Sequence, residues 1–126
     1  MASKLGYDGG MTLAIQVADL GRGRAFYEGV LGFKHLYTVE EIAWAEFATE
    51  AGGVNVGLSQ VEKPKVGAGP VPTFGIKDIA AARATLEGAG VKFDGPTQEI
   101  PGLVKLATFF DPDGNALMLT ESLQQG

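Results

Sequence analysis

The chain has 126 residues, the length of one domain, and 45% of them are hydrophobic, so global disorder is not expected. Its formal net charge of −5 argues against a nucleic acid partner, because an acidic surface repels the phosphate backbone. Cysteine is absent, which excludes disulfides, zinc–thiolate sites and cysteine nucleophiles; without a signal-like segment or a membrane-length apolar run, we expect a soluble cytoplasmic protein.

The first half of the chain predicts a βαβββ module over residues 11–60, preceded by a flexible arm of residues 1–10. Apolar and polar residues alternate from Met11 to Val17, which is typical of a half-buried strand. Asp19 is placed to cap a helix with an apolar stripe, and Gly32 is placed to end it. Three further strands are expected, over residues 33–39, 42–48 and 54–58.

A linker and a second module are predicted for the second half. Residues 61–70 are rich in Gly and Pro toward their end and have no hydrophobic period, as in a linker. The pattern then restarts, so residues 71–122 predict a second βαβββ module, with Asp78 as its helix cap. Its strands are expected over residues 71–77, 91–93, 103–110 and 116–120, with a turn at 111–115.

An internal repeat relates the two modules. Three pairs of dipeptides recur at one constant spacing: Asp19-Leu20 with Asp78-Ile79, Arg24-Ala25 with Arg83-Ala84, and Glu28-Gly29 with Glu87-Gly88. Arg22 and Arg83 are expected to be solvated helix charges. One face of each sheet would pack on the helix of its own module. The other faces carry small and polar residues, and curled toward each other they would line a cleft suited to a small ligand.

Three stretches resemble the signature segments of the vicinal oxygen chelate superfamily, the group of glyoxalases, bleomycin-resistance proteins and dioxygenases: Gln16–Leu20, Ala25–Phe33 and Phe110–Asn115. The resemblance covers residues 11–122. It implies an α+β fold in which two tandem βαβββ modules form one domain, with a curled mixed sheet around a cleft. It also implies a homodimer that takes a small-molecule ligand. It specifies no reaction, because this fold hosts many chemistries.

The resemblance also implies four metal-ligand positions, and none of them holds a competent ligand here. Enzymes of the family usually bind a divalent metal through His and Glu side chains at strand positions. Carried over to this sequence, those positions are Thr12, Gly57, Val71 (or Pro72 in the neighbouring register) and Met118. None supplies the carboxylate oxygen or imidazole nitrogen that such a cation prefers. We therefore expect neither a bound metal nor another cofactor.

One acidic–aromatic pair and a set of mostly neutral polar side chains are the candidate ligand-binding residues. Trp44 and Glu46 share one face of a strand, and an indole offers a flat surface to an aromatic or cationic group. Glu46 could act as an acid, a base or the partner of a bound cation. The opposite face packing inward would instead put Trp44 in the core and Glu46 on an exposed edge. The other candidates are predicted to face the cleft: Thr12, Gln16, Asn55, Ser59, Thr73, Thr108 and Met118.

These features predict a metal-independent small-molecule binding protein that sequesters an antibiotic or a metabolite. The alternative is an enzyme, a lyase, isomerase or dioxygenase-like member acting on a small oxygenated substrate, with Glu46 as its catalytic base. His35, the single histidine, has no partner of catalytic type in the sequence and is predicted to be a partly exposed strand residue. A third possibility is a module that only assists a partner protein.

Overall fold

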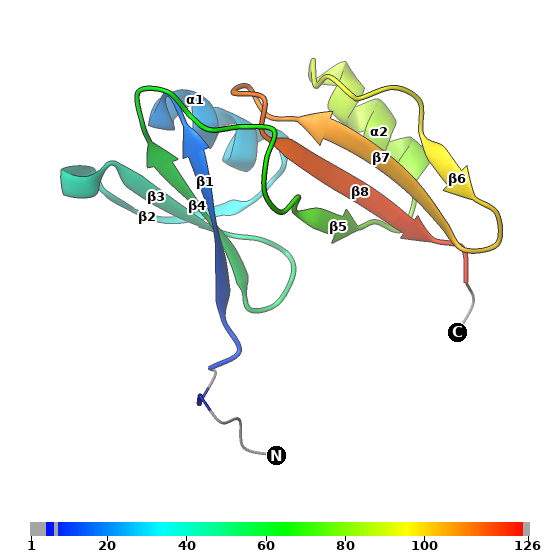
Figure 1. Cartoon of the computed structure of the whole chain (residues 1–126), viewed down its shortest axis with the longest axis horizontal. Helices are drawn as coiled ribbons and strands as arrows, with labels where there is room; N and C mark the ends of the chain where they lie inside the picture. The colour runs from blue at the N-terminus through cyan, green and yellow to red at the C-terminus, as the bar shows by residue number, and fades with distance from the viewer. Residues whose placement is uncertain (1–4, 7, 125–126) are drawn as a thin grey trace. The chain divides into compact units, whose positions relative to one another are not determined.

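The computed structural model describes residues 5–6 and 8–124, and the chain divides into two compact units, residues 1–62 and 63–126 (Figure 1). Each unit holds one four-stranded mixed sheet and a helical segment after its first strand, unit 1 has a short 3-10 helix as well, and neither sheet is closed. The predicted α+β class and the tandem βαβββ order are confirmed. The predicted arm, residues 1–10, lies partly outside the described residues. Within the described part of the chain, no helix has the length and apolar character needed to cross a membrane.

Unit 1 contains the first βαβββ module. Its elements are β1 (Met11–Val17), α1 (Leu20–Arg24), the π-helix η1 (Ala25–Val30), β2 (Lys34–Val39), the 3-10 helix η2 (Glu40–Ile42), β3 (Trp44–Ala48) and β4 (Val54–Gln60). The strand order is β1-β4-β3-β2, with β1 and β4 parallel and the other pairs antiparallel. This topology puts the first and last strands of the module side by side.

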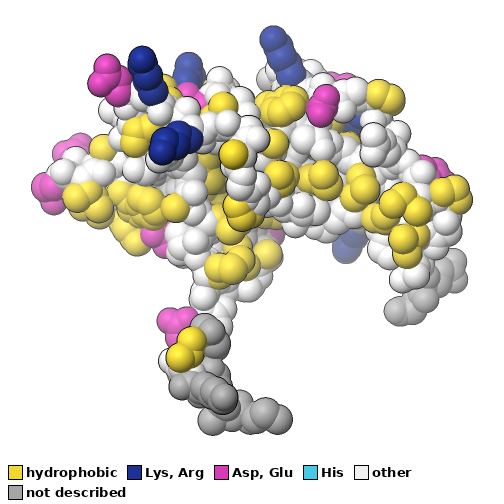
Figure 2. Space-filling model, viewed as in Figure 1, with side chains coloured by type: hydrophobic (Ala, Val, Ile, Leu, Met, Phe, Trp, Pro, Cys, Tyr) yellow, Lys and Arg dark blue, Asp and Glu magenta, His cyan; other side chains and the backbone are white. Residues whose placement is uncertain are grey.

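The core of unit 1 lies between its sheet and its helical segment. Val56, Leu58 and Phe47 are fully buried on one sheet face, as the alternation of apolar residues predicts. A Cβ at Gly23 would lie 2.8 Å from the Leu58 side chain, so glycine there lets the helix approach the sheet closely. Hydrophobic side chains also reach the surface of the protein (Figure 2), and in unit 1 they include Ile42, which is 67% exposed.

The helical segment of unit 1 begins and ends as predicted but changes its winding between. The Asp19 side chain accepts a hydrogen bond from the Arg22 N–H at 2.9 Å, and Gly32 at the other end has a φ of +79°. The second half is π-helical, with a Leu31 N–H donating to the Phe26 carbonyl at 2.9 Å. A regular α-helix is therefore wrong for this segment. The wider turn accompanies the burial of two consecutive aromatic residues, Phe26 and Tyr27.

Unit 2 repeats the topology of unit 1. Its elements are β5 (Thr73–Gly75), α2 (Ile79–Gly88), β6 (Gln98–Ile100), β7 (Val104–Phe110) and β8 (Ala116–Ser122), in the order β5-β8-β7-β6. The strand predicted over residues 91–93 is wrong, because only a single bridge joins Phe93 to Phe109 there. The sheet is completed instead by β6, which was not predicted. All three residues of β6 are exposed, so they carry no apolar alternation that would mark a strand.

The internal repeat is visible in the way both helices are capped. Asp78 caps α2 by accepting from the Ala81 N–H at 3.1 Å, as Asp19 caps α1. In each unit a side chain of the last strand also accepts from the first helical N–H. Gln60 accepts from Leu20 and Glu121 accepts from Ile79, both at 2.8 Å. The repeat therefore extends beyond the matching dipeptides to the connection between each helix and its sheet.

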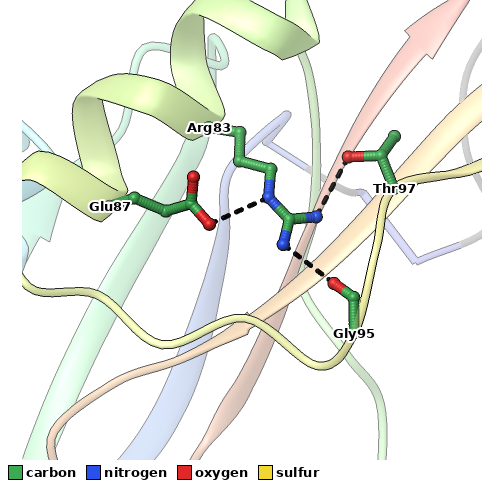
Figure 3. A network of polar contacts seen from close by, with 4 residues as sticks. All are labelled: Arg83, Glu87, Gly95 and Thr97. Carbon is green, nitrogen blue, oxygen red and sulfur yellow. Dashed lines mark hydrogen bonds and ion pairs between the residues drawn. The ribbon is translucent and has the colours of Figure 1, made fainter.

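Arg83 ties α2 to the segment that leads into β6 (Figure 3). Its guanidinium donates to Glu87 at 3.2 Å, to the Thr97 hydroxyl at 3.0 Å and to the Gly95 carbonyl at 2.8 Å. It also lies over the Phe93 ring, 4.4 Å from the ring centroid. The expectation of a solvated helix charge is wrong for Arg83, because an irregular segment without a hydrophobic period supplies most of its partners.

Candidate functional site

The candidate site lies on the face of the unit 1 sheet that points away from its core. The strand register pairs Thr12 with Asn55, Gly57 with Glu46, and Glu46 with Tyr37. Side chains alternate along each strand, so these residues project opposite the buried Val56, Leu58 and Phe47. Two neighbouring rows of residues, contributed by four strands, are thereby assembled on the open face.

Glu46 is the centre of this group of residues because it accepts four hydrogen bonds. Its Oε1 accepts from the Tyr37 hydroxyl at 2.8 Å and from the Trp44 indole N–H at 3.1 Å. Its Oε2 accepts from the Asn55 amide at 2.8 Å and from the Thr12 hydroxyl at 3.4 Å. A carboxylate offers about four lone-pair positions, so these four neutral donors fill them. The carboxylate is held in place from both sides.

The same contacts decide the charge of the site. The hydrogen bond from Asn55 lowers the pKa of Glu46 below its ordinary value of 4.5, as do those from Tyr37, Trp44 and Thr12, against the opposing effect of partial burial. The hydrogen bond to Glu46 raises the pKa of Tyr37, together with partial burial and the negative charge of Glu46, while the Trp44 N–H opposes this shift. At neutral pH Glu46 is therefore ionised and Tyr37 is protonated.

No cation in the described part of the chain neutralises Glu46. Ion pairs found there include those of Arg24 with Glu28 at 2.6 Å and of Arg83 with Glu87 at 3.2 Å, and neither involves Glu46. The partners of Glu46 are all neutral side chains. The site thus combines a full negative charge with hydrogen-bond donors that carry none.

Gly57 makes room for the aromatic part of the site. A Cβ built on Gly57 would overlap the indole ring of Trp44, so the ring lies directly over the backbone of β4. Trp44 is half-buried on the open face and does not belong to the core, and Tyr37 beside it is 47% exposed. Two aromatic side chains therefore remain accessible next to the ionised carboxylate.

The positions that the family resemblance assigns to a metal do not fit one. Gly57 has no side chain, and the Thr12 hydroxyl is turned toward Glu46. Val71 and Met118 supply neither a carboxylate nor an imidazole. Across residues 5–6 and 8–124, no three His, Asp or Glu side chains form a group able to hold a metal ion. We assign no metal-dependent step to these residues.

The remaining predicted residues fall into two groups. Gln16 and Ser59 pair with each other on the open face of unit 1, and Ser59 also pairs with Trp44, but neither contributes one of the four bonds to Glu46. In unit 2 the register pairs Met118 with both Thr73 and Thr108, which places these three on one sheet face. Within its own unit, each group shares a face; their role as ligand contacts stays a prediction.

Tyr37 is the site residue that sequence reasoning missed. A regular antiparallel register continuing from the pair of His35 and Phe47 would place Leu36 opposite Glu46. A bulge between His35 and Tyr37 shifts the register by one residue, so Tyr37 takes that place. No residue pattern in β2 marks the bulge. His35 itself is a half-buried strand residue, as predicted, and its Nε2 lies 2.8 Å from the Thr38 hydroxyl.

Comparison with known proteins agrees with this fold. The sequence model of the Glyoxalase/Bleomycin resistance protein/Dioxygenase superfamily matches residues 11–119. A member of that superfamily from Sphaerobacter thermophilus DSM 20745 is 25% identical, with a TM-score of 0.77 over 90% of this chain and 96% of that one. TnmS3, an antibiotic binding protein from Streptomyces sp. CB03234, is 25% identical, with a TM-score of 0.75 over 90% and 94%.

The fosfomycin resistance protein FosX of Listeria monocytogenes shares the fold at 16% identity, with a TM-score of 0.77 over 92% of this chain and 94% of that one. No curated protein sequence matches the chain. The family match spans both modules, from the first residue of β1 into β8. The chain therefore belongs to the glyoxalase/bleomycin resistance protein/dioxygenase superfamily.

Proposed function

We propose that the chain is a metal-independent binding protein that sequesters a small molecule, an antibiotic or a metabolite. The observation that carries this proposal is the ionised Glu46, held by four neutral donors beside an accessible indole. Sites for small molecules typically combine such an aromatic surface with a few fixed polar groups. The similarity to TnmS3, which is described as an antibiotic binding protein, supports the same reading.

The state of Glu46 argues against the alternative in which it is a catalytic base. A general base works best when its pKa lies near the working pH. The four donors lower the pKa of Glu46, and they occupy the lone pairs that would have to take up a proton. Proton abstraction by Glu46 would therefore begin from a weak base that must first lose a hydrogen bond. Binding of a ligand does not require Glu46 to take up a proton.

We further propose that residues 11–122 act as one binding domain, which works as a homodimer in the cytoplasm. Family resemblance supports the dimer, and the absence of cysteine supports a reducing compartment. The ligand-contacting set in this proposal comprises Thr12, Gln16, Tyr37, Trp44, Glu46, Asn55, Ser59, Thr73, Thr108 and Met118. Tyr37 is added to the predicted set because it donates to Glu46.

Native mass spectrometry of freshly purified protein, before and after treatment with EDTA, tests the proposal. We expect a dimer that carries an organic adduct or accepts one without metal. Trp44 is the single tryptophan, so its fluorescence should respond when that adduct binds. Trp44→Phe should remove this signal, whereas Trp44→Ala should also weaken binding; Leu36→Ala, on an exposed neighbouring strand position, is the control.

One result would contradict the proposal. A stoichiometric divalent metal in the native spectrum, together with metal-dependent turnover of a methylglyoxal–glutathione adduct or a catechol, would favour the enzyme. In that case Glu46→Gln should abolish turnover.

A further inference from the structure

The hydrogen bonds around Glu46 all run in one direction. An ionised carboxylate can only accept, so each neighbour must turn a hydrogen toward it. The Tyr37 and Thr12 hydroxyls commit their single hydrogens to Glu46, and Asn55 commits one of its two amide hydrogens. The charge of Glu46 therefore sets the orientation of the polar groups that surround it.

This orientation determines what the surrounding groups present elsewhere. A hydroxyl that has used its hydrogen retains only lone pairs, so Tyr37 Oη and Thr12 Oγ1 can serve a ligand only as acceptors. The Asn55 amide directs its nitrogen to Glu46, which leaves its carbonyl oxygen as the group able to accept. Donation to a carboxylate also polarises a hydroxyl and makes its oxygen a stronger acceptor. The rim of the site, defined as these three oxygens, is therefore an acceptor-only rim.

We propose that the acceptor-only rim of Tyr37, Asn55 and Thr12 selects a ligand group that donates hydrogen bonds and carries positive charge, such as an amidine, guanidine or protonated amine attached to a flat ring. This inference rests on the proposed binding function and specifies its ligand class. The Tyr37 and Thr12 oxygens offer a carboxylate or phosphate no donor, and Asn55 retains only its second amide hydrogen, so such a group would face three acceptor oxygens and the charge of Glu46. Anionic ligands are thus disfavoured by the same bonds that favour cationic ones.

Two further features of unit 1 fit a cationic, planar group. Glu46 has no cationic partner within the described residues, so a bound cation would supply the missing charge. Trp44 and Tyr37 both remain accessible beside it, and aromatic faces attract cations. A flat ring that stacks on the indole would hold its donor group near the rim.

The test uses three ring compounds that differ only in the polar group: benzamidine, benzamide and benzoate. The 15N-labelled full chain contains one indole, so its Nε1–H gives a single resonance, and that hydrogen is bonded to Glu46. Each probe is titrated while this resonance is followed. We expect benzamidine to bind most tightly, benzamide less tightly, and benzoate at least about ten-fold more weakly than benzamidine, the effect of one charge-assisted hydrogen bond.

Glu46→Gln isolates the cause of the selectivity. A glutamine amide must donate on one side, so Tyr37 or Asn55 has to reverse and present a donor to the ligand. The preference for benzamidine over benzoate should fall about ten-fold or more. Glu41→Gln is the matched control: it removes the same charge from an exposed residue of the neighbouring 3-10 helix and should leave the preference unchanged.

Tyr37→Phe keeps the test decisive if Glu46→Gln fails to fold. Tyr37 is 47% exposed, so its ring can stay in place while the rim loses one acceptor. Benzamidine binding should weaken several-fold, and benzoate binding should not. Equal binding of benzamidine and benzoate to the wild type would contradict the proposed selectivity of the rim while leaving the proposed binding function intact. Failure of all three probes to move the indole resonance at millimolar concentration would also contradict this selectivity. The native mass spectrum tests the binding function independently.

Discussion

The two units share one scaffold but differ in what they place on their open faces. In unit 1 the register sets Glu46 beside Gly57, and in unit 2 the equivalent register sets Thr108 beside Met118. Gly57 leaves space that the Trp44 ring fills, whereas the corresponding position in unit 2, Met118, carries a side chain. Among the residues that the structure describes, the charged, aromatic site therefore arises in unit 1. Topology is repeated between the modules, and side chains at a few register positions decide which of them carries the site.

The largest expected effect comes from filling the space above Gly57. Gly57→Ala places a Cβ where the Trp44 ring lies, so the ring has to leave its place over β4. We expect a loss of about 1–3 kcal/mol in the free energy of unfolding, together with a changed Trp44 fluorescence spectrum. Gly75→Ala in β5 of unit 2 is the control, because nothing lies within 4 Å of its Cβ position. Equal destabilisation by both substitutions, measured by urea unfolding, would contradict the packing of the indole on β4.

The two helical ion pairs provide a second contrast between the units. Arg83 bonds to Glu87, Thr97 and Gly95 and lies over Phe93, so Arg83→Ala should lower the free energy of unfolding by about 1–2 kcal/mol. Arg24→Ala breaks only the exposed ion pair with Glu28 and should leave the free energy of unfolding nearly unchanged.

Hydrogen exchange should locate the Arg83 effect in the segment between α2 and β6. If Arg24→Ala lowers the free energy of unfolding as much as Arg83→Ala does, the additional contacts of Arg83 do not stabilise the protein.

Glu46 should make the stability of the protein depend on acid pH. Its pKa is lower in the folded state than its ordinary value of 4.5, so its contribution is present above about that pH and is lost as the pH falls through the folded value. Glu46→Gln should therefore flatten the decline of melting temperature below pH 4.5, relative to Glu41→Gln. An unchanged decline would mean that the four donors do not favour the ionised form.

The smallest expected effect concerns Ala43, the residue before Trp44. Its φ of +50° is the one positive value outside glycine in the described residues, and unit 2 shows no equivalent there. Ala43→Gly should raise the free energy of unfolding by about 0.5–1 kcal/mol, because glycine adopts this conformation without steric cost. Ala48→Gly, in the ordinary extended conformation of β3, should lower it by a similar amount. Destabilisation by Ala43→Gly in chemical denaturation would show that the alanine methyl group matters more than the strain.

The alternation of apolar residues was sufficient to predict the modules and to place Trp44 and Glu46 on one face. It also set Thr12 and Asn55 on that face, because burial of one sheet face fixes the direction of every side chain along a strand. It could not reveal Tyr37, which depends on a bulge, nor β6, whose three residues are exposed. The bonds to Glu46 likewise depend on side-chain rotamers and on the absence of a side chain at Gly57, neither of which has a periodic signal.

The most direct test of the central claim is an NMR titration of the Glu46 carboxyl carbon, with the Trp44 indole N–H followed in the same samples. Glu46→Gln assigns the carboxyl resonance. A carboxylate held by four donors should titrate below its ordinary pKa of 4.5, and the indole N–H should shift with the same midpoint because it donates to Glu46. A midpoint near neutrality would contradict this account, since it would identify Glu46 as a group poised to exchange a proton, as a catalytic base is.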